Sequence, residues 1–347
     1  MNPSFNHKRW IGPGILLLTA GMVLAAPASA AEGQGTAART LTEKELAQQI
    51  FDTMLHVPGT KPGFRPVHAK GLVCKGTFAP SKEAAALSKA AHFQETSVPI
   101  TVRLSDGSPD PAIPDNSPNA GPRGMAIRFQ IPGGRETDIV AMSHNGFVVS
   151  DGAEFLALQK AVVATDPGKP HPWPIEEFLT THPAALKFVQ DNRVVPASFA
   201  TELFFSNNSF LFVNNEGKKQ PGRYRILPLD GPRNLSEAEA KDKPANFLGQ
   251  EFRTRLAAGP VKFRLVIQLP NPGDPTKDSS IVWAEDRQTV EAGTISVTSV
   301  VADSEVAEKE LAFDPTNLID GIELSDDPLP SLRSRVYALS VRHRRQK

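Results

Sequence analysis

Residues 100–105 read Ile-Thr-Val-Arg-Leu-Ser, a stretch in which apolar and polar side chains alternate without interruption. Successive side chains of a β-strand point to opposite faces of the sheet, so Arg103 and Ser105 share one face. Residues 125–131 and 261–269 show a similar alternation. The pattern therefore predicts three strands of a β-sheet.

Weaker signals extend this sheet and add helices. Asn214–Gly217 predicts a hairpin turn, and Thr42–Glu45 forms a capping box that begins a helix. Further strands are expected at residues 72–78, 138–142, 203–213, 223–227 and 294–301, and further helices at 81–92, 151–162, 174–179, 183–190 and 246–258. We predict one α+β domain over residues 42–347, a mostly antiparallel β-barrel core with helices grouped around it.

The N-terminus has the pattern of an export signal. Basic residues Lys8 and Arg9 precede an apolar run, and small residues follow at a cleavage site. We predict a signal peptide at residues 1–30, a flexible leader at 31–41, and a periplasmic or secreted protein that has no membrane association after cleavage. A membrane anchor is the alternative, although the apolar run is short and broken near Pro13.

Composition excludes several classes of site. The 38 basic and 38 acidic residues balance, which argues against a general nucleic-acid binder. Cys74 is the single cysteine, so an intrachain disulfide, a cysteine-based zinc site and an iron–sulfur cluster are excluded. The role of Cys74 stays open; a small buried apolar side chain is the simplest interpretation.

Near the C-terminus, Arg333 and Tyr337 stand four residues apart. On a helix this spacing puts both side chains on one face. A neighbouring cation favours the ionised phenol, and a phenolate is a strong ligand for ferric iron. An ordinary amphipathic helix with a half-buried tyrosine would show the same spacing.

A histidine, His68, stands in Phe-Arg-Pro-Val-His-Ala-Lys-Gly at residues 64–71. A lone histidine in a loop that leads into a strand is more often structural than catalytic. Here Arg65 lies three residues before it and Gly71 three after it, and the strand of residues 100–105 follows. The combination makes His68 a candidate for acid–base chemistry.

Taken in order, these motifs resemble those of the haem catalase superfamily over residues 64–337. The chain is similar to the smaller catalase-related peroxidases, which keep the haem-binding barrel and lack the long N-terminal arm and the extra C-terminal domain. The motifs that carry the resemblance are Arg65–Gly71, Val102–Ser105, Pro122–Phe129, Asp138–Val140, Phe313–Asn317, Gly321–Ser325, Asp327, and Arg333 with Tyr337.

The resemblance implies a role for each matching residue. Tyr337 would be the proximal iron ligand of a haem b, with Arg333 holding it as phenolate. On the distal side His68 would be the acid and base, and Ser105 would hydrogen-bond it and fix its tautomer.

Other matching positions would contact the haem itself. Arg65 and Arg103 match residues that pair with the haem propionates, since a guanidinium suits a carboxylate geometrically. Val67 matches an apolar residue and Phe155 an aromatic residue that pack near the haem. A surface ion pair for Arg103 and plain core packing for Phe155 are the alternatives.

One position departs from the family pattern. Catalases place an asparagine, a second distal hydrogen-bond donor, soon after the strand of residues 138–142, and Met142 stands there when the sequences are aligned without a gap. We expect Asn145 to take this catalytic role if the loop is rearranged, with His144 as a competitor.

The resemblance implies a haem-dependent peroxidase that reduces hydrogen peroxide or an organic peroxide with small organic electron donors. Because the expected asparagine is missing, we predict weak catalase activity. Two alternatives stay open: a hydroperoxide-rearranging enzyme like the allene oxide synthases, and an exported haem-binding protein without turnover. The oligomeric state is open as well, with a homodimer as one option.

Overall fold

The computed structural model describes residues 41–346. The predicted signal peptide, residues 1–30, and the predicted leader up to residue 40 lie outside the described residues. Among the described residues, no helix has both the length and the apolar character needed to cross a membrane.

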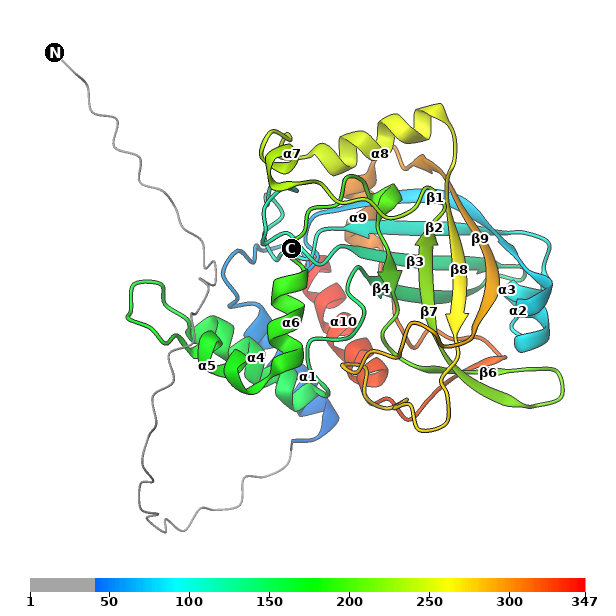
Figure 1. Cartoon of the computed structure of the whole chain (residues 1–347), viewed down its shortest axis with the longest axis horizontal. Helices are drawn as coiled ribbons and strands as arrows, with labels where there is room; N and C mark the ends of the chain where they lie inside the picture. Colours follow the sequence, from blue (N-terminus) through cyan, green and yellow to red (C-terminus); the bar gives the residue numbers. More distant parts are fainter. Residues whose placement is uncertain (1–40, 347) are drawn as a thin grey trace, which may run out of the picture.

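Eight antiparallel strands form a closed barrel, which confirms the predicted fold class (Figure 1). The strands follow one another in chain order around the barrel, except that β6 is left out, and β9 pairs with β1 to close it. They are β1 (Gly71–Pro80), β2 (Val98–Ser105), β3 (Gly124–Ile131), β4 (Arg135–Met142), β5 (Phe204–Phe205), β7 (Lys219–Pro228), β8 (Val261–Gln268) and β9 (Thr289–Val300).

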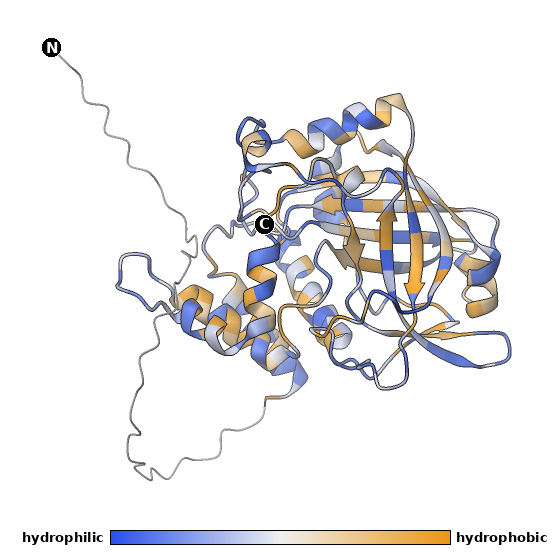
Figure 2. Cartoon of the chain, in the orientation of Figure 1, coloured by the Kyte–Doolittle hydropathy of each residue, from blue (hydrophilic) through white to orange (hydrophobic). Residues whose placement is uncertain are grey.

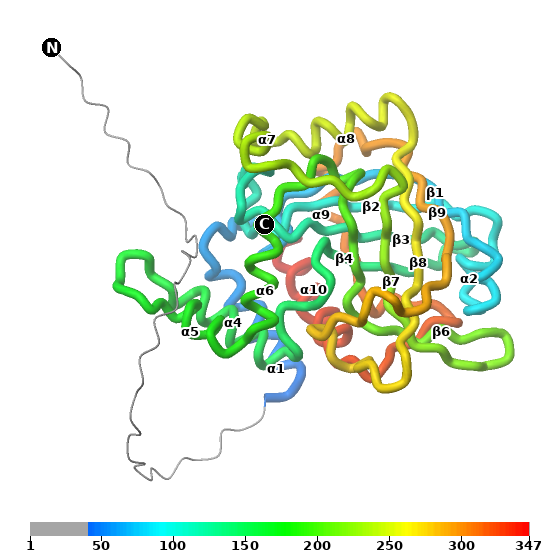
Figure 3. The backbone as a smooth tube through the Cα atoms, in the orientation of Figure 1, coloured from blue at the N-terminus to red at the C-terminus, as the bar shows by residue number. Residues whose placement is uncertain are grey.

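The predicted strand 203–213 is two strands in the structure. Strand β6 (Phe210–Val213) leaves the barrel and pairs with β7 and β10 (Ile322–Leu324), and its hairpin with β7 projects beyond the barrel in Figure 3. The break has a polar cause, because Asn207 and Asn208 are buried between the two strands and use their side chains for hydrogen bonds to other segments. A continuous strand would not leave these amides their partners.

The barrel interior is the main hydrophobic core, and the predicted alternation of residues 100–105 sets its wall. Ile100, Val102 and Leu104 are buried in this core, while Arg103 and Ser105 point to the outer face. Figure 2 shows the same alternation of hydropathy along the strands. Full burial of one such apolar side chain contributes about 1.5–3 kcal/mol, so a shift of one residue in register would be costly.

Helices cover the barrel and its outer face. The predicted helix 81–92 is interrupted, because Ser88 is extended and its hydroxyl donates to the Gly321 carbonyl at 2.7 Å. The helices are α1 (Glu43–Met54), α2 (Lys82–Leu87), α3 (Ala91–Gln94), α4 (Gly152–Ala164), α5 (Pro174–Thr181), α6 (Pro183–Asp191), the 3₁₀ turn Phe199–Thr201, α7 (Glu237–Lys241), α8 (Phe247–Ala258), α9 (Ser304–Glu310) and α10 (Leu329–Arg345).

The long helix α10 lies between the barrel and the group formed by α1, α4, α5 and α6 (Figure 1). Its residues Leu332 and Val336 pack against Ile50 and Met54 of α1 in a second hydrophobic cluster. The opposite side of α10 is thereby turned toward the outer face of β2, β3 and β4.

Candidate functional site

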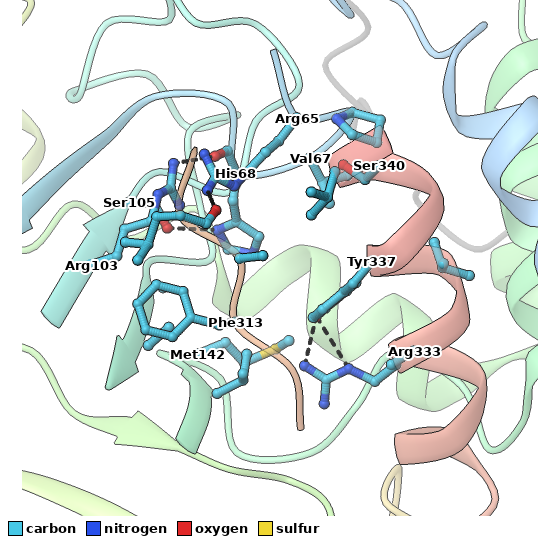
Figure 4. Close-up of a pocket in the computed structure, with 18 of the residues that line it drawn as sticks. Arg65, Val67, His68, Arg103, Ser105, Met142, Phe313, Arg333, Tyr337 and Ser340 are labelled. Atoms are coloured by element: carbon cyan, nitrogen blue, oxygen red, sulfur yellow. Dashed lines mark hydrogen bonds between the residues drawn. The ribbon is translucent and has the colours of Figure 1, made fainter. Parts of the chain in front are cut away.

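A cavity lies between α10 and the outer face of β2, β3 and β4 (Figure 4). The empty space that it encloses, including its open mouth, is about 820 Å³. The loop of residues 65–68 and the segment 311–313 complete its wall. His68 and Ser105 stand on one side, and Tyr337 and Arg333 on the other.

The register of the sheet sets one wall of the cavity. Ser105 of β2 pairs with Gly124 of β3, which pairs with Met142 of β4. Directly paired residues in an antiparallel sheet point to the same face, so Ser105 and Met142 flank the position of Gly124. A Cβ atom at Gly124 would lie only 2.9 Å from His68 Nδ1. The absence of a side chain at Gly124 therefore makes room for the imidazole between Ser105 and Met142.

The backbone of His68 is in the left-handed region, with φ 53°, a conformation that is uncommon for any residue with a side chain. Surrounding contacts hold it there. Its amide donates to the Gly107 carbonyl at 3.2 Å, its carbonyl accepts from Arg103 Nη2 at 2.8 Å, and Nδ1 lies 3.1 Å from Ser105 Oγ. Such strain at a non-glycine residue is typical of functional sites.

Burial, together with the neighbouring positive charges, keeps His68 neutral. Its accessible surface faces the cavity, and burial lowers the pKa of His68 to about 3, with further contributions from the guanidinium groups of Arg103, Arg333 and Arg65. A hydrogen bond with the backbone of Asp106 acts in the opposite direction without offsetting them. At neutral pH His68 is therefore an unprotonated base.

Three arginines gather at one end of the cavity, and all three are largely buried. Arg65 and Arg103 both hydrogen-bond the carboxylate of Glu308, at 3.4 Å and 3.1 Å. Arg65 and Arg344 both donate to the Leu311 carbonyl, at 2.7 Å and 3.2 Å. In this cluster three positive charges face one negative charge.

Burial and this excess of positive charge both lower the pKa values of two of these arginines. Burial, followed by repulsion from Arg103 and Arg344, lowers the pKa of Arg65 to about 8. Burial and Arg103 lower the pKa of Arg344 to about 10. The Nε atom of Arg344 is buried and has no hydrogen-bond partner among the described residues. These are the properties of a site built to accept anions.

On the opposite wall, Arg333 and Tyr337 of α10 contact each other as their spacing predicted. Arg333 Nη2 lies 2.9 Å and Nε 3.3 Å from the Tyr337 hydroxyl. The third nitrogen of the guanidinium, Nη1, donates to the buried amide of Asn208, whose nitrogen donates to Asp327 at 2.8 Å. The guanidinium is thus fixed from both sides beside the phenol.

A family model of catalase matches residues 28–346. The chain belongs to the catalase family. Two catalase-related peroxidases are among its relatives. The one from Mycolicibacterium paratuberculosis is 36% identical over 85% of this chain and 94% of its own length. The one from Synechococcus elongatus is 32% identical over 97% of this chain and 96% of its own length.

Solved catalases share the fold. Catalase A of Saccharomyces cerevisiae superposes with a TM-score of 0.72 at 20% identity, covering 85% of this chain. A bacterial catalase gives a TM-score of 0.71, also at 20% identity, covering 91% of this chain. The chain spans 64% and 63% of these two proteins, less than two thirds of either.

Most of the residues predicted for the site line this one catalase-family cavity. They come from a loop, strand β2 and helix α10, and they are Arg65, Val67, His68, Arg103, Ser105, Arg333 and Tyr337. The structure therefore brings together side chains that are up to 272 residues apart in the sequence. Their chemical roles remain those implied by the family.

Two predicted residues lie outside the cavity wall. Asn145 instead donates to Glu285 Oε1 at 3.4 Å, and its loop is held by other contacts, among them the hydrogen bond that the amide of the next residue, Gly146, donates to Asn207. The loop does not carry Asn145 to the part of the described structure that lines the cavity, and Met142, at the position of the family's asparagine, lines it instead. His144, the alternative to Asn145 for this role, points elsewhere as well: its Nε2 lies 3.2 Å from Asp191 Oδ2.

The aromatic side chain of Phe155 also lies elsewhere. It packs among the helices with its ring 5.6 Å from that of Phe147. This is the core packing that was the alternative for Phe155. Cys74 is likewise buried in the barrel core, and burial raises the pKa of its thiol to about 12.

Sequence reasoning missed three residues of the site. Arg344 follows Tyr337 by seven residues, two turns of α10, so helical spacing could have revealed it. Glu308 and Asn208 gave no local signal, because each is placed beside its arginine by segments distant in the chain.

The catalase family implies haem, and the residues of this cavity fit that group. A phenol that a guanidinium contacts is a suitable iron ligand. The two excess positive charges of the arginine cluster match the two carboxylates that haem carries. The unpartnered Nε of Arg344 adds a free donor at the same place.

Proposed function

We propose that this protein is a peroxidase that uses haem b to reduce hydrogen peroxide or organic peroxides with small organic electron donors. The observation that carries the proposal is the placement of two pairs, His68 with Ser105 and Tyr337 with Arg333, on opposite walls of one cavity. The catalase-related peroxidases among the relatives support it. The predicted signal peptide supports a periplasmic or secreted location, which cell fractionation would test.

The cavity residues divide the work of holding the cofactor. Tyr337 would bind the iron, while Arg65, Arg103 and Arg344 would bind the haem carboxylates. When bound, haem supplies a redox-active iron that takes up the oxidising equivalents of a peroxide. Arg333 would support this chemistry by hydrogen-bonding the Tyr337 oxygen through Nη2 and Nε, which fixes the position of that oxygen.

The distal residues move the protons. With the Nδ1 proton directed to Ser105, Nε2 of His68 is a free base that faces the cavity. It takes the proton from one peroxide oxygen and returns it to the other as the O–O bond breaks, so the departing oxygen leaves as water or alcohol. The low pKa of His68 favours the unprotonated form that the first step needs.

Catalase activity is expected to be weak. The catalase reaction requires the site to orient a second peroxide, and a hydrogen-bond donor beside His68 would do this. Met142 occupies that place and offers only a thioether, a weak acceptor that has no proton to donate.

The decisive test is the absorption spectrum of the haem-loaded protein. We expect a Soret band with high-spin ferric features that is lost or shifted in Tyr337→Phe, because this change removes only the ligand oxygen. The second tyrosine of the chain is a matched control: Tyr224 is buried in the barrel core, so Tyr224→Phe should keep the spectrum. An unchanged spectrum in Tyr337→Phe would exclude the proposed ligand.

Stopped-flow assays with an organic donor and an oxygen electrode then measure the two activities. Donor oxidation with slow oxygen release is the expected result. Vigorous oxygen release without a donor would contradict the proposed preference for peroxidase activity.

A further inference from the structure

Three methionines of the described residues border the cavity, and they differ in how they face it. Met54 and Met125 are buried, with 4% and 1% of their surface exposed. Met142 retains accessible surface. In Figure 4 its side chain lies beside Phe313 and extends toward Tyr337 and Arg333 on the other side of the cavity.

The sheet register explains the contrast between Met125 and Met142. Met142 pairs with Gly124 and shares the outer face with Ser105, so its side chain leaves the sheet next to Gly124, over which the imidazole of His68 lies. Met125 is the next residue of β3 after Gly124, and its side chain points the other way, into the barrel core. Two thioethers therefore stand on neighbouring strands, one toward the cavity and one away from it.

We propose that Met142 is a site of self-modification, at which a peroxide substrate oxidises the thioether to the sulfoxide. The inference rests on the proposed peroxidase function, which supplies the oxidant. In the step the O–O bond of hydrogen peroxide breaks and one oxygen forms a bond to sulfur. The sulfur loses two electrons, and the second oxygen leaves as water with both protons.

The location favours this reaction at Met142 over other sulfur atoms. A thioether is soft and polarisable, and this one adjoins the base that we propose to handle the peroxide protons. The same position would be inert if it carried the amide expected from the family pattern, since an amide offers no sulfur to oxidise.

The product would change the distal wall. A sulfoxide is polar where the thioether was apolar, and it is reversible through methionine sulfoxide reductases. It places a hydrogen-bond acceptor beside His68. Peroxide would thus alter the site during turnover, and a reductase would restore it.

Peptide mass spectrometry of the haem-loaded protein tests the proposal. After brief exposure to a small molar excess of hydrogen peroxide without donor, the peptide with Met142 should gain the mass of one oxygen atom in most chains, and the peptide with Met125 should not. Haem-free protein treated alike is one control. His68→Ala with haem is another, and Met142 oxidation should slow in it.

Two variants connect the modification to its effect. In wild-type protein, the peroxidase rate should change over successive peroxide additions and return after treatment with the two sulfoxide reductases. Met142→Leu keeps the side-chain volume but has no sulfur at this position, so its peroxidase rate should stay constant over successive peroxide additions. Met125→Leu is the matched control and should behave as wild type does.

The outcomes separate this inference from the proposed function. Donor oxidation without added oxygen on Met142 would overturn the inference and leave the peroxidase function standing. Equal oxidation of Met142 in the haem-free protein, or of Met125 in the loaded protein, would also overturn it, because the modification would then be ordinary oxidation by free peroxide and not a consequence of turnover in this cavity. If neither the donor nor Met142 is oxidised, both proposals fall.

Discussion

The two walls of the cavity are built in opposite ways. On the proximal wall, Arg333, Tyr337 and Arg344 come from one helix, α10, at spacings that a helix places on one face. On the distal wall, His68 comes from a loop and Ser105 from a strand, and the sheet register brings them together. A helix carries its own geometry, whereas the distal wall exists only once the barrel has closed.

The walls also differ in charge and strain. The proximal wall holds the guanidinium of Arg333 beside the Tyr337 hydroxyl, where Asn208 buttresses it. The distal wall holds a neutral imidazole in a strained backbone conformation. The proximal side is therefore suited to ligate the metal of a cofactor, and the distal side to move protons. Variants on each side should show this division.

The largest effect is expected on the distal wall. His68→Ala should leave haem bound and slow the reaction with peroxide by about 10² to 10⁴, because it removes the general acid and base. Stopped-flow spectroscopy of the loaded variant measures this rate. His56→Ala changes an exposed histidine at the end of α1 and should react as wild type does. An unaffected rate in His68→Ala would favour the non-catalytic haem-binding alternative.

The second-largest effect is expected at Arg333, which fixes the Tyr337 hydroxyl on the proximal wall. Arg333→Gln should lower haem affinity or peroxidase activity by about 10- to 100-fold, as is usual for residues that orient a metal ligand. Its control is Arg335→Gln, because Arg335 is exposed on the same helix and pairs with Glu43 at 3.0 Å. If both variants lose activity equally, the effect belongs to the helix and not to the contact between Arg333 and Tyr337.

A smaller effect is expected at the arginine cluster. Arg344→Gln should speed haem loss about tenfold, the low end of the contribution of a hydrogen bond to a charged group, since Arg65 and Arg103 remain. Transfer of haem to an apo-globin measures the rate. Arg345→Gln is the neighbouring control, exposed and paired with Glu310 at 3.3 Å. Equal rates of haem loss in the two variants would show that Arg344 does not help to bind the haem.

The smallest effect is on stability, and of the two walls only the distal one should contribute to it, together with a histidine of the barrel core. The pKa of His68 is about 3, and burial lowers the pKa of His92 in the barrel core to about 3 as well, both below the ~6.5 of an unfolded chain. The unfolded chain binds more protons between these values, so stability is full above pH 6.5 and falls as the pH drops toward 3.

Urea unfolding of the haem-free protein at pH 7 and pH 5.5 measures this loss. Each histidine should lower the free energy of unfolding by on the order of 1 kcal/mol when the pH falls from 7 to 5.5. His92→Leu should remove the part of this stability loss that His92 causes and leave the part that His68 causes. A pH dependence that is unchanged in both His92→Leu and His68→Ala would contradict the assignment.

The predictions from sequence succeeded where the chemistry is local. The alternation of residues 100–105 gave the barrel wall and placed Arg103 and Ser105 on its outer face. The spacing of Arg333 and Tyr337 gave their contact. The strand expected at residues 203–213 was wrong in its continuity, because the partners of Asn208 lie more than a hundred residues away.

The sequence by itself determined the alternation of the strands, the helix that carries Tyr337, and the family. These depend on spacings of two and four residues, which the backbone geometry of strands and helices converts directly into faces. The tertiary structure alone decided what surrounds His68. Closure of the barrel set the register that puts Met142 beside the imidazole and left Asn145 outside, because contacts between distant segments, and not local spacing, determine which side chain reaches the cavity.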